Sequence, residues 1–161
     1  MKSLLLALAC TISLNSVVRA QDARPTFKLE GNNLVLPAPI EFKSGTSTLL
    51  PSANAGLQHI KDYLQDKTYI TLVRIEGHAG TQQLSEDRAV TICKWLTGNG
   101  IDCSRLLPVG FGSTKPVADG STAAGVTANT RIVVTNATLR GRAIGGMPVD
   151  GGGNVAGDPC K

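Results

Sequence analysis

Apolar residues recur at helical spacing in two stretches of the chain. The first stretch follows Pro51, a residue that suits the first turn of a helix. Its apolar stripe, with members at i, i+4, i+7 and i+11, consists of Ala53, Leu57, Ile60 and Leu64. The second stretch, over 85–97, has a stripe of Ala89, Ile92, Cys93 and Leu96 and ends at Gly98-Asn99-Gly100. These periods predict two helices, each with one face toward a core.

Segments rich in β-branched and other apolar residues predict strands around these helices. The expected strands cover 33–42, 69–76, 106–111 and 131–135. Because proline donates no backbone N–H, Pro37, Pro39 and Pro108 indicate edge positions. The polar stretch 112–128 is predicted to be a loop. The order β-α-β-α-β-β predicts an α/β fold, an α+β sandwich in which two helices pack on one mixed sheet.

The 161 residues suffice for one domain with terminal extensions. Residues 1–20 have the pattern of a secretory signal peptide: a basic residue, an apolar run, and small residues before a cleavage point after Ala20. Cys10 leaves lipidation as an alternative, which we disfavour because the apolar run before it is short. We expect a domain over 21–139 with a polar lead-in. Residues 140–161 are predicted to be a flexible Gly-rich tail that folding does not require.

Composition and charge exclude several classes of function. Removal of Lys2 and Arg19 with the signal reduces the 16 basic residues to 14, against 12 acidic ones, which leaves a net charge of +2. No concentrated basic face with aromatic residues is visible, so nucleic acid is not an expected partner. The two histidines, His59 and His78, have no metal-binding spacing, so no metal or other cofactor is expected. After the signal, no apolar run is long enough to cross a bilayer, so no transmembrane segment is predicted in the mature chain.

Three cysteines remain after the predicted cleavage, and an extracytoplasmic compartment permits disulfides. Cys93 and Cys103 lie ten residues apart, across a helix end and a glycine-rich turn. We predict a disulfide between these two residues. Cys160 is then left over, either as a free thiol or paired with another chain.

The stretch between the strand over 69–76 and the second helix contains the strongest candidate for a binding site. The chain turns through Gly77 and Gly80 and restarts as a helix at Ser85, the predicted N-cap. Arg88 lies about three residues inside this helix, beside its unpaired N–H groups, so the turn can receive a carboxylate. The alternative is that Arg88 pairs with a Glu or Asp side chain on its own surface.

Short motifs follow one another in a fixed order between residues 40 and 136. They are Ile40-Glu41-Phe42, Ile75-Glu76-Gly77-His78, Leu84-Ser85-Glu86-Asp87-Arg88-Ala89, Gly100-Ile101, Gly110-Phe111-Gly112, Lys115-Pro116 and Asn129-Thr130-Arg131-Ile132. In this order and spacing, the segment resembles the OmpA-like C-terminal domain of outer-membrane proteins, peptidoglycan-associated lipoproteins and flagellar stator proteins. The resemblance implies noncovalent binding of peptidoglycan, mainly through the diaminopimelate of its stem peptide.

The resemblance also implies a set of binding residues. In the family, an Asp two positions after the Gly-His holds the ammonium of diaminopimelate, and the Arg of Leu-Ser-x-x-Arg-Ala holds its carboxylate. Arg88 matches this Arg, but Gly80 stands at the Asp position, and the turn before Leu84 is shorter than in the family. The candidate ligand-binding residues are therefore Ala79, Gly80, Thr81, Leu84, Arg88, Asn129 and Arg131.

Two functions follow from these observations. The first is a periplasmic, outer-membrane-associated module that binds diaminopimelate-type peptidoglycan noncovalently at an altered site. The alternative is a non-binding structural subunit of a cell-envelope assembly, such as a secretion or motility complex, with other envelope proteins as partners. No catalytic residues are predicted, because His78 has neither a nucleophile motif nor an orienting partner near it, and phosphate-loop and dinucleotide patterns are missing.

Overall fold

The computed structural model describes residues 26–161. The α-helices are α1 (Asn54–Asp66), α2 (Gln82–Gly98) and α3 (Ala123–Asn129), and single 3₁₀ turns occur at Pro51–Ala53 and Cys103–Arg105. The strands are β1 (Leu29–Glu30), β2 (Asn33–Leu34), β3 (Ile70–His78), β4 (Leu106–Gly110), β5 (Arg131–Leu139), β6 (Arg142–Ala143) and β7 (Asn154–Val155). The predicted signal peptide, with Cys10, lies outside the described residues.

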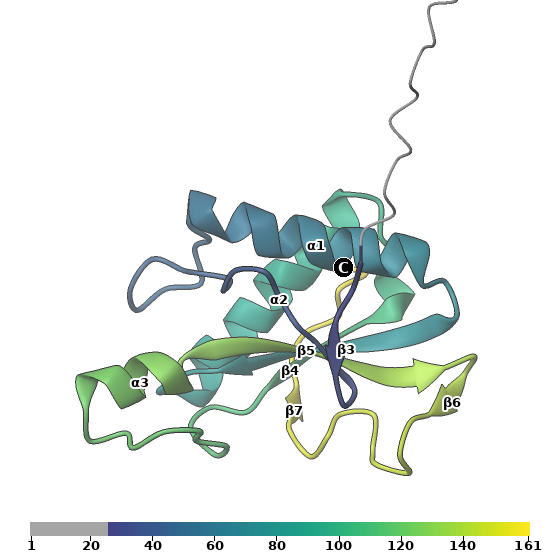
Figure 1. Ribbon diagram of the computed structural model, residues 1–161. Coiled ribbons are helices and arrows are strands. Elements are labelled where there is room, and N and C mark those ends of the chain that lie inside the picture. The colour runs from purple at the N-terminus through teal and green to yellow at the C-terminus, as the bar shows by residue number, and fades with distance from the viewer. Residues whose placement is uncertain (1–25) are drawn as a thin grey trace, which may run out of the picture.

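One mixed sheet organises the described part of the chain. Its strand order is β1-β2-β5-β3-β4-β7, and β6 pairs with β5. The central strand β3 runs antiparallel to β5 and parallel to β4. Helices α1 and α2 lie together on one face of this sheet (Figure 1). The predicted α/β sandwich is confirmed.

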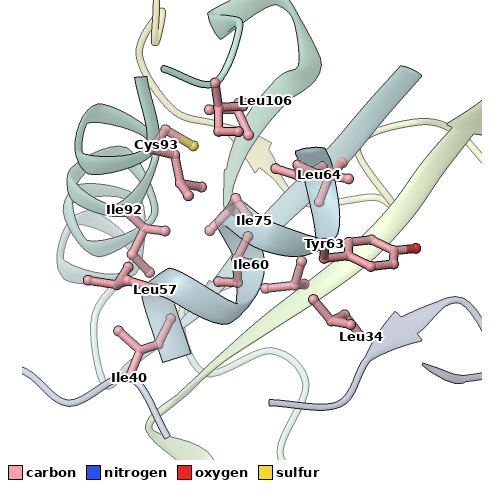
Figure 2. Packing of buried hydrophobic residues seen from close by; sticks show 14 of the residues in the cluster. Leu34, Ile40, Leu57, Ile60, Tyr63, Leu64, Ile75, Ile92, Cys93 and Leu106 are labelled. Carbon is pink, nitrogen blue, oxygen red and sulfur yellow. The ribbon is translucent and has the colours of Figure 1, made fainter. Parts of the chain in front are cut away.

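The core lies between α1, α2 and the sheet (Figure 2). The predicted stripe of α1 is buried at Leu57, Ile60 and Leu64, and Tyr63 beside it donates its hydroxyl to Asn136 Oδ1 at 3.1 Å. All four predicted stripe residues of α2 are buried as well: Ala89, Ile92, Cys93 and Leu96. Both helical periods are therefore confirmed, because one face of each helix covers the sheet.

Helix α2 begins earlier than its predicted N-cap at Ser85. Thr81 is the N-cap, and its side chain accepts a hydrogen bond from the backbone N–H of Leu84 at 3.2 Å. Ser85 is fully buried one turn inside the helix, where its hydroxyl donates to Gln82 O and accepts from the N–H of Gly112. Serine is in general the somewhat better N-cap, but the hydroxyl of Ser85 is occupied by Gln82 and Gly112 inside the helix, so Thr81 takes the cap position.

Two other predicted boundaries and one predicted edge position differ from the structure. Of the strand predicted over 33–42, only β2 pairs in the sheet, and Phe42 forms an isolated bridge with Leu49. The loop predicted over 112–128 contains the start of α3, a helix capped by Thr122 that buries little except Gly125 and therefore shows no apolar stripe. Strand β4 is not an edge, because β7 pairs with its outer side. Pro108 is tolerated there, since its carbonyl accepts from Ala156 on that outer side and β3 loses no donor.

The segment after Leu139, which the sequence predicts to be a flexible tail, packs against the sheet. Figure 1 shows its first part in yellow on the side of the sheet away from α1 and α2, and its end beyond β7 reaching the C-terminus close to the helices. Strand β7 pairs with β4 in the register Val109↔Val155. The carbonyl of Val149 accepts from Arg74 Nη1 at 2.8 Å. The tail contributes backbone groups to these hydrogen bonds, so no pattern of its side chains predicts them. The domain limits 21–139 and 140–161 remain predictions.

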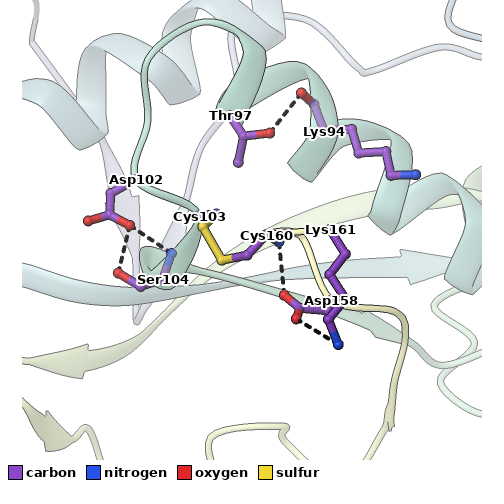
Figure 3. The surroundings of a disulfide bond; sticks show 8 residues. All are labelled: Lys94, Thr97, Asp102, Cys103, Ser104, Asp158, Cys160 and Lys161. Atoms are coloured by element: carbon purple, nitrogen blue, oxygen red, sulfur yellow. Dashed lines mark hydrogen bonds and ion pairs between the residues drawn. A yellow bond between two sulfur atoms is a disulfide. The ribbon is translucent and has the colours of Figure 1, made fainter.

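The disulfide joins Cys103 to Cys160, so the predicted Cys93–Cys103 pairing is wrong (Figure 3). Cys93 is a free thiol that faces the core, and burial raises its pKa above the ordinary value. Cys103 opens a surface 3₁₀ turn, next to which the end of the chain passes. Cys160 is therefore neither free nor available to another chain. The bridge closes a loop of 57 residues and ties the tail to the domain.

We expect the unreduced, denatured protein to show one alkylatable thiol among its described cysteines, at Cys93. Mass spectrometry of a proteolytic digest should find the peptides of Cys103 and Cys160 linked. Alkylation before denaturation should leave Cys93 unmodified, because it is fully buried. A linked Cys93 peptide would contradict this assignment.

Candidate functional site

The turn between β3 and α2 brings most of the predicted site residues together. Strand β3 ends at His78, and only Ala79, Gly80 and Thr81 precede α2. A Cβ at Gly77 would collide with the backbone of Ser85, so this glycine lets α2 start directly against the strand. A Cβ at Gly80 meets nothing within 4 Å, and Gly80 therefore faces open space.

A groove of about 510 Å³ runs past this turn. Three segments line it: 39–50 before α1, the β3–α2 region, and the end of α3 with the start of β5. Of the seven candidate residues, five line this groove: Ala79, Gly80, Leu84, Arg88 and Arg131. A smaller pocket of about 180 Å³ adjoins it and shares Ala79, Gly80, Val126 and Thr130 with it. The short turn thus separates two hollows at the point where Gly80 carries no side chain.

Arg88 is a buried cation whose end opens on the groove. Its side chain is 5% exposed, and burial lowers the pKa of its guanidinium from the ordinary value. Nε donates to the carbonyl of Thr46 at 2.9 Å, and the guanidinium carbon lies 4.8 Å from the ring centre of Phe42. Within residues 26–161, Arg88 forms no ion pair, and its two terminal nitrogens have no hydrogen-bond partner.

The alternative for Arg88, a pair with a nearby acidic side chain, does not occur in the structure. Glu86 accepts from Gln82 Nε2 at 2.8 Å, and Asp87 accepts from Gln83 Nε2 at 2.9 Å. Phe42 and Thr46 instead hold the guanidinium in place. A held cation with free donors is suited to an anion such as a carboxylate.

The remaining predicted site residues have structural contacts. Asn129 caps the loop before α3: its side-chain oxygen accepts from the N–H groups of Val117 and Ala118, and its amide donates to Ala118 O. Thr81 caps α2. Arg131 donates to the carbonyls of Lys115 and Asn129, and its pKa is lowered by burial. Asn129 and Thr81 thus shape the walls, whereas Arg131 lines the groove itself.

Glu41 lines the same groove but was not among the predicted residues. Its only signal in the sequence was its place in the motif Ile40-Glu41-Phe42. The segment reaches the turn through tertiary packing, with Ile40 in the core and Phe42 under Arg88. Sequence spacing alone does not reveal this contact, since more than 40 positions separate Glu41 from Arg88.

A second polar cluster lies on the other face of β3 and is not part of the groove. Residues 74, 76 and 78 alternate with the core residues Val73 and Ile75, so they point away from α1 and α2. Arg74 pairs with Glu76 at 2.6 Å, Thr135 donates to Glu76 at 2.9 Å, and His78 Nε2 lies 3.5 Å from Glu76 Oε2. Burial by itself raises the pKa of Glu76, but His78, Arg74 and Thr135 together lower it to about 2.

Comparison with known proteins shows the family of the chain. A family model for the OmpA family matches residues 41–130, and the chain belongs to that family. It is 31% identical over 117 residues to the protein named "Probable lipoprotein YiaD" of Escherichia coli strain K12, a match that covers 68% of this chain and 53% of that protein. The chain thus spans about half the length of this relative.

Two solved structures have the same fold. The periplasmic domain of Helicobacter pylori MotB matches with a TM-score of 0.57 and 15% identity, over 68% of this chain and 86% of that one. The peptidoglycan-associated lipoprotein of Burkholderia pseudomallei matches with a TM-score of 0.52 and 24% identity, over 60% of this chain and 86% of that one. At these identities the likeness concerns the fold. Within the described residues, every helix is too short or too polar to cross a membrane.

Proposed function

We propose that this chain is a noncatalytic periplasmic module of the cell envelope that binds peptidoglycan noncovalently through the diaminopimelate of the stem peptide. The observation that carries the proposal is Arg88, a held guanidinium with unpaired terminal nitrogens at the edge of the groove. Membership of the OmpA family and a neighbour in fold that is named peptidoglycan-associated support it. Other envelope proteins would keep the module close to the outer membrane.

Arg88 would bind the carboxylate of diaminopimelate through two parallel hydrogen bonds. Such charge-assisted bonds are worth about 1.5–3 kcal/mol each when the site is shielded from water. The planar fork of arginine fits a carboxylate, whereas the ammonium of lysine acts as a point charge. The packing of Phe42 against the guanidinium fixes the direction of the fork before a ligand arrives.

We expect Arg88→Ala to weaken binding to peptidoglycan about tenfold or more, and Arg88→Lys to recover only part of the loss. The measurement is co-sedimentation with purified diaminopimelate-type sacculi, with lysine-type sacculi for comparison. Arg142→Ala is the matched control, because Arg142 is exposed on β6, outside the groove. Circular dichroism should confirm that each variant is folded, since Arg88 also supports Thr46 and Phe42.

The site differs from that of the family at Gly80, where an Asp is expected. Because a Cβ at Gly80 meets nothing within 4 Å, Gly80→Asp should fold normally and add a carboxylate at the edge of the groove. We expect this variant to sediment with diaminopimelate-type sacculi more strongly than the parent chain. Unchanged sedimentation would show that position 80 is too far from the bound ammonium.

The missing carboxylate at Gly80 is also the observation that favours the second candidate function, a structural subunit of an envelope assembly that does not bind peptidoglycan. The same co-sedimentation experiment distinguishes the two functions. If the parent chain does not sediment with either type of sacculus and Gly80→Asp gains nothing, the structural role replaces the binding role.

A further inference from the structure

The groove is lined by two cationic side chains and one acidic side chain that form no ion pair with each other. Among the described residues that line it, Glu41 is the single carboxylate, and Arg88 and Arg131 are the guanidinium groups. Glu41 forms no ion pair with either arginine, since the ion pairs within residues 26–161 involve other side chains. Opposite charges that share a hollow and remain apart match a ligand that carries both signs.

The backbone and one side chain hold Glu41 in place. Its carbonyl accepts from the N–H of Leu50 at 3.0 Å, next to the bridge between Phe42 and Leu49. Ser52 Oγ donates to Glu41 Oε2 at 2.7 Å. The other carboxylate oxygen has no hydrogen-bond partner among residues 26–161. Glu41 is therefore an oriented acceptor with one free oxygen.

We propose that Glu41 accepts the ammonium group of the ligand whose carboxylate Arg88 binds, so that a segment before α1 supplies the acceptor that the β3–α2 turn lacks. This inference rests on the proposed function. An ammonium group that leaves water for a groove needs a paired charge or several acceptors. The turn offers no carboxylate, because Gly80 has no side chain, whereas the exposed Glu41 lies on the same hollow as Arg88. The ligand class is an amino acid end with a free ammonium and a free carboxylate.

The test uses soluble stem tripeptides and the whole mature chain. One probe ends in meso-diaminopimelate, a second has the side-chain amino group of that residue acetylated, and fluorescence anisotropy measures their affinity. The parent chain should bind the free amine about tenfold more tightly than the acetylated probe. In Glu41→Gln this preference should disappear, because the glutamine carries no charge for the ammonium.

Asp87→Asn is the matched control for this comparison. This substitution removes the same charge at the residue next to Arg88. Asp87 is exposed, lies outside the groove and accepts a hydrogen bond from Gln83. This variant should keep the tenfold preference. If Glu41→Gln keeps it too, or if Asp87→Asn loses it equally, Glu41 is not the acceptor.

The outcome also separates this inference from the proposed function. If the parent chain and Arg88→Ala bind the free-amine probe equally weakly, the proposed function fails and the assignment of Glu41 fails with it. If Arg88→Ala loses binding while Glu41→Gln binds like the parent chain, the proposed function stands and the assignment of Glu41 is overturned. Gly80→Asp in the Glu41→Gln background should restore the preference for the free amine, since Gly80 lines the same groove.

Discussion

Truncation of the chain after Leu139 should destabilise the domain by at least about 4 kcal/mol, because the removed segment carries the disulfide to Cys103. In the chain-entropy model, a bridge that closes a loop of 57 residues contributes about that amount. Truncation also removes β7 from β4 and takes away the backbone acceptor of Arg74. For a domain of this size, such a loss lowers the melting temperature by roughly 15 °C.

The measurement is thermal unfolding of the oxidised proteins, followed by circular dichroism. The double variant Cys103→Ser and Cys160→Ser is the matched control, because it breaks the bridge and keeps every residue of the tail. We expect it to melt between the parent chain and the truncated chain, since β7 and the contact of Val149 with Arg74 remain. A truncated chain that melts within a few degrees of the parent chain would support the prediction from the sequence that the tail is dispensable.

The tail shows which part of the fold the sequence could not predict. The helices were predictable because a helix with one buried face has apolar residues at helical spacing, as at Leu57 and Ile92. The tail attaches through the carbonyls of Val149 and Gly151 and through the N–H of Ala156, and every residue offers such groups. Backbone pairing therefore leaves little trace in a glycine-rich sequence.

The disulfide shows a second kind of error. Proximity along the chain favoured Cys103 as the partner of Cys93, but the helical period had already placed Cys93 on the buried stripe with Ala89 and Leu96. In the structure Cys93 is fully buried on this stripe, whereas Cys103 lies on a 3₁₀ turn that the end of the chain reaches with Cys160.

The residues of the candidate site also differ in how far the sequence could predict them. That Arg88, Leu84 and Gly80 share a groove could be predicted, because they lie within nine positions of one another on one turn and the first turns of one helix. Glu41 could not, because it enters the groove through packing of a distant irregular segment. Asn129 lines the smaller pocket rather than the groove, and its motif position did not reveal that its side chain accepts hydrogen bonds from Val117 and Ala118.

Replacement of Glu76 by glutamine should destabilise the domain by about 3–5 kcal/mol at neutral pH, because Arg74 would keep its buried charge without a counter-charge. Both side chains are about 10% exposed, and their nitrogen and oxygen atoms lie 2.6 Å apart under the tail. Glutamine retains the shape of glutamate and can still accept from Thr135. The loss therefore measures the charge of Glu76 rather than a cavity.

The same residue sets an acid limit on stability. Because the pKa of Glu76 in the folded chain lies at about 2, below its ordinary value of 4.5, the carboxylate stabilises the fold fully above pH 4.5. That contribution, about 3 kcal/mol, is lost as the pH falls from 4.5 toward 2.

Urea unfolding of the parent chain at pH 7, 4 and 2.5 should show this decline in the free energy of unfolding, and Glu76→Gln should lack the part that Glu76 contributes. Asp87→Asn, which changes an exposed side chain on α2, should retain the decline of the parent chain. Equal acid sensitivity in the parent chain and Glu76→Gln would mean that other carboxylates control the acid limit.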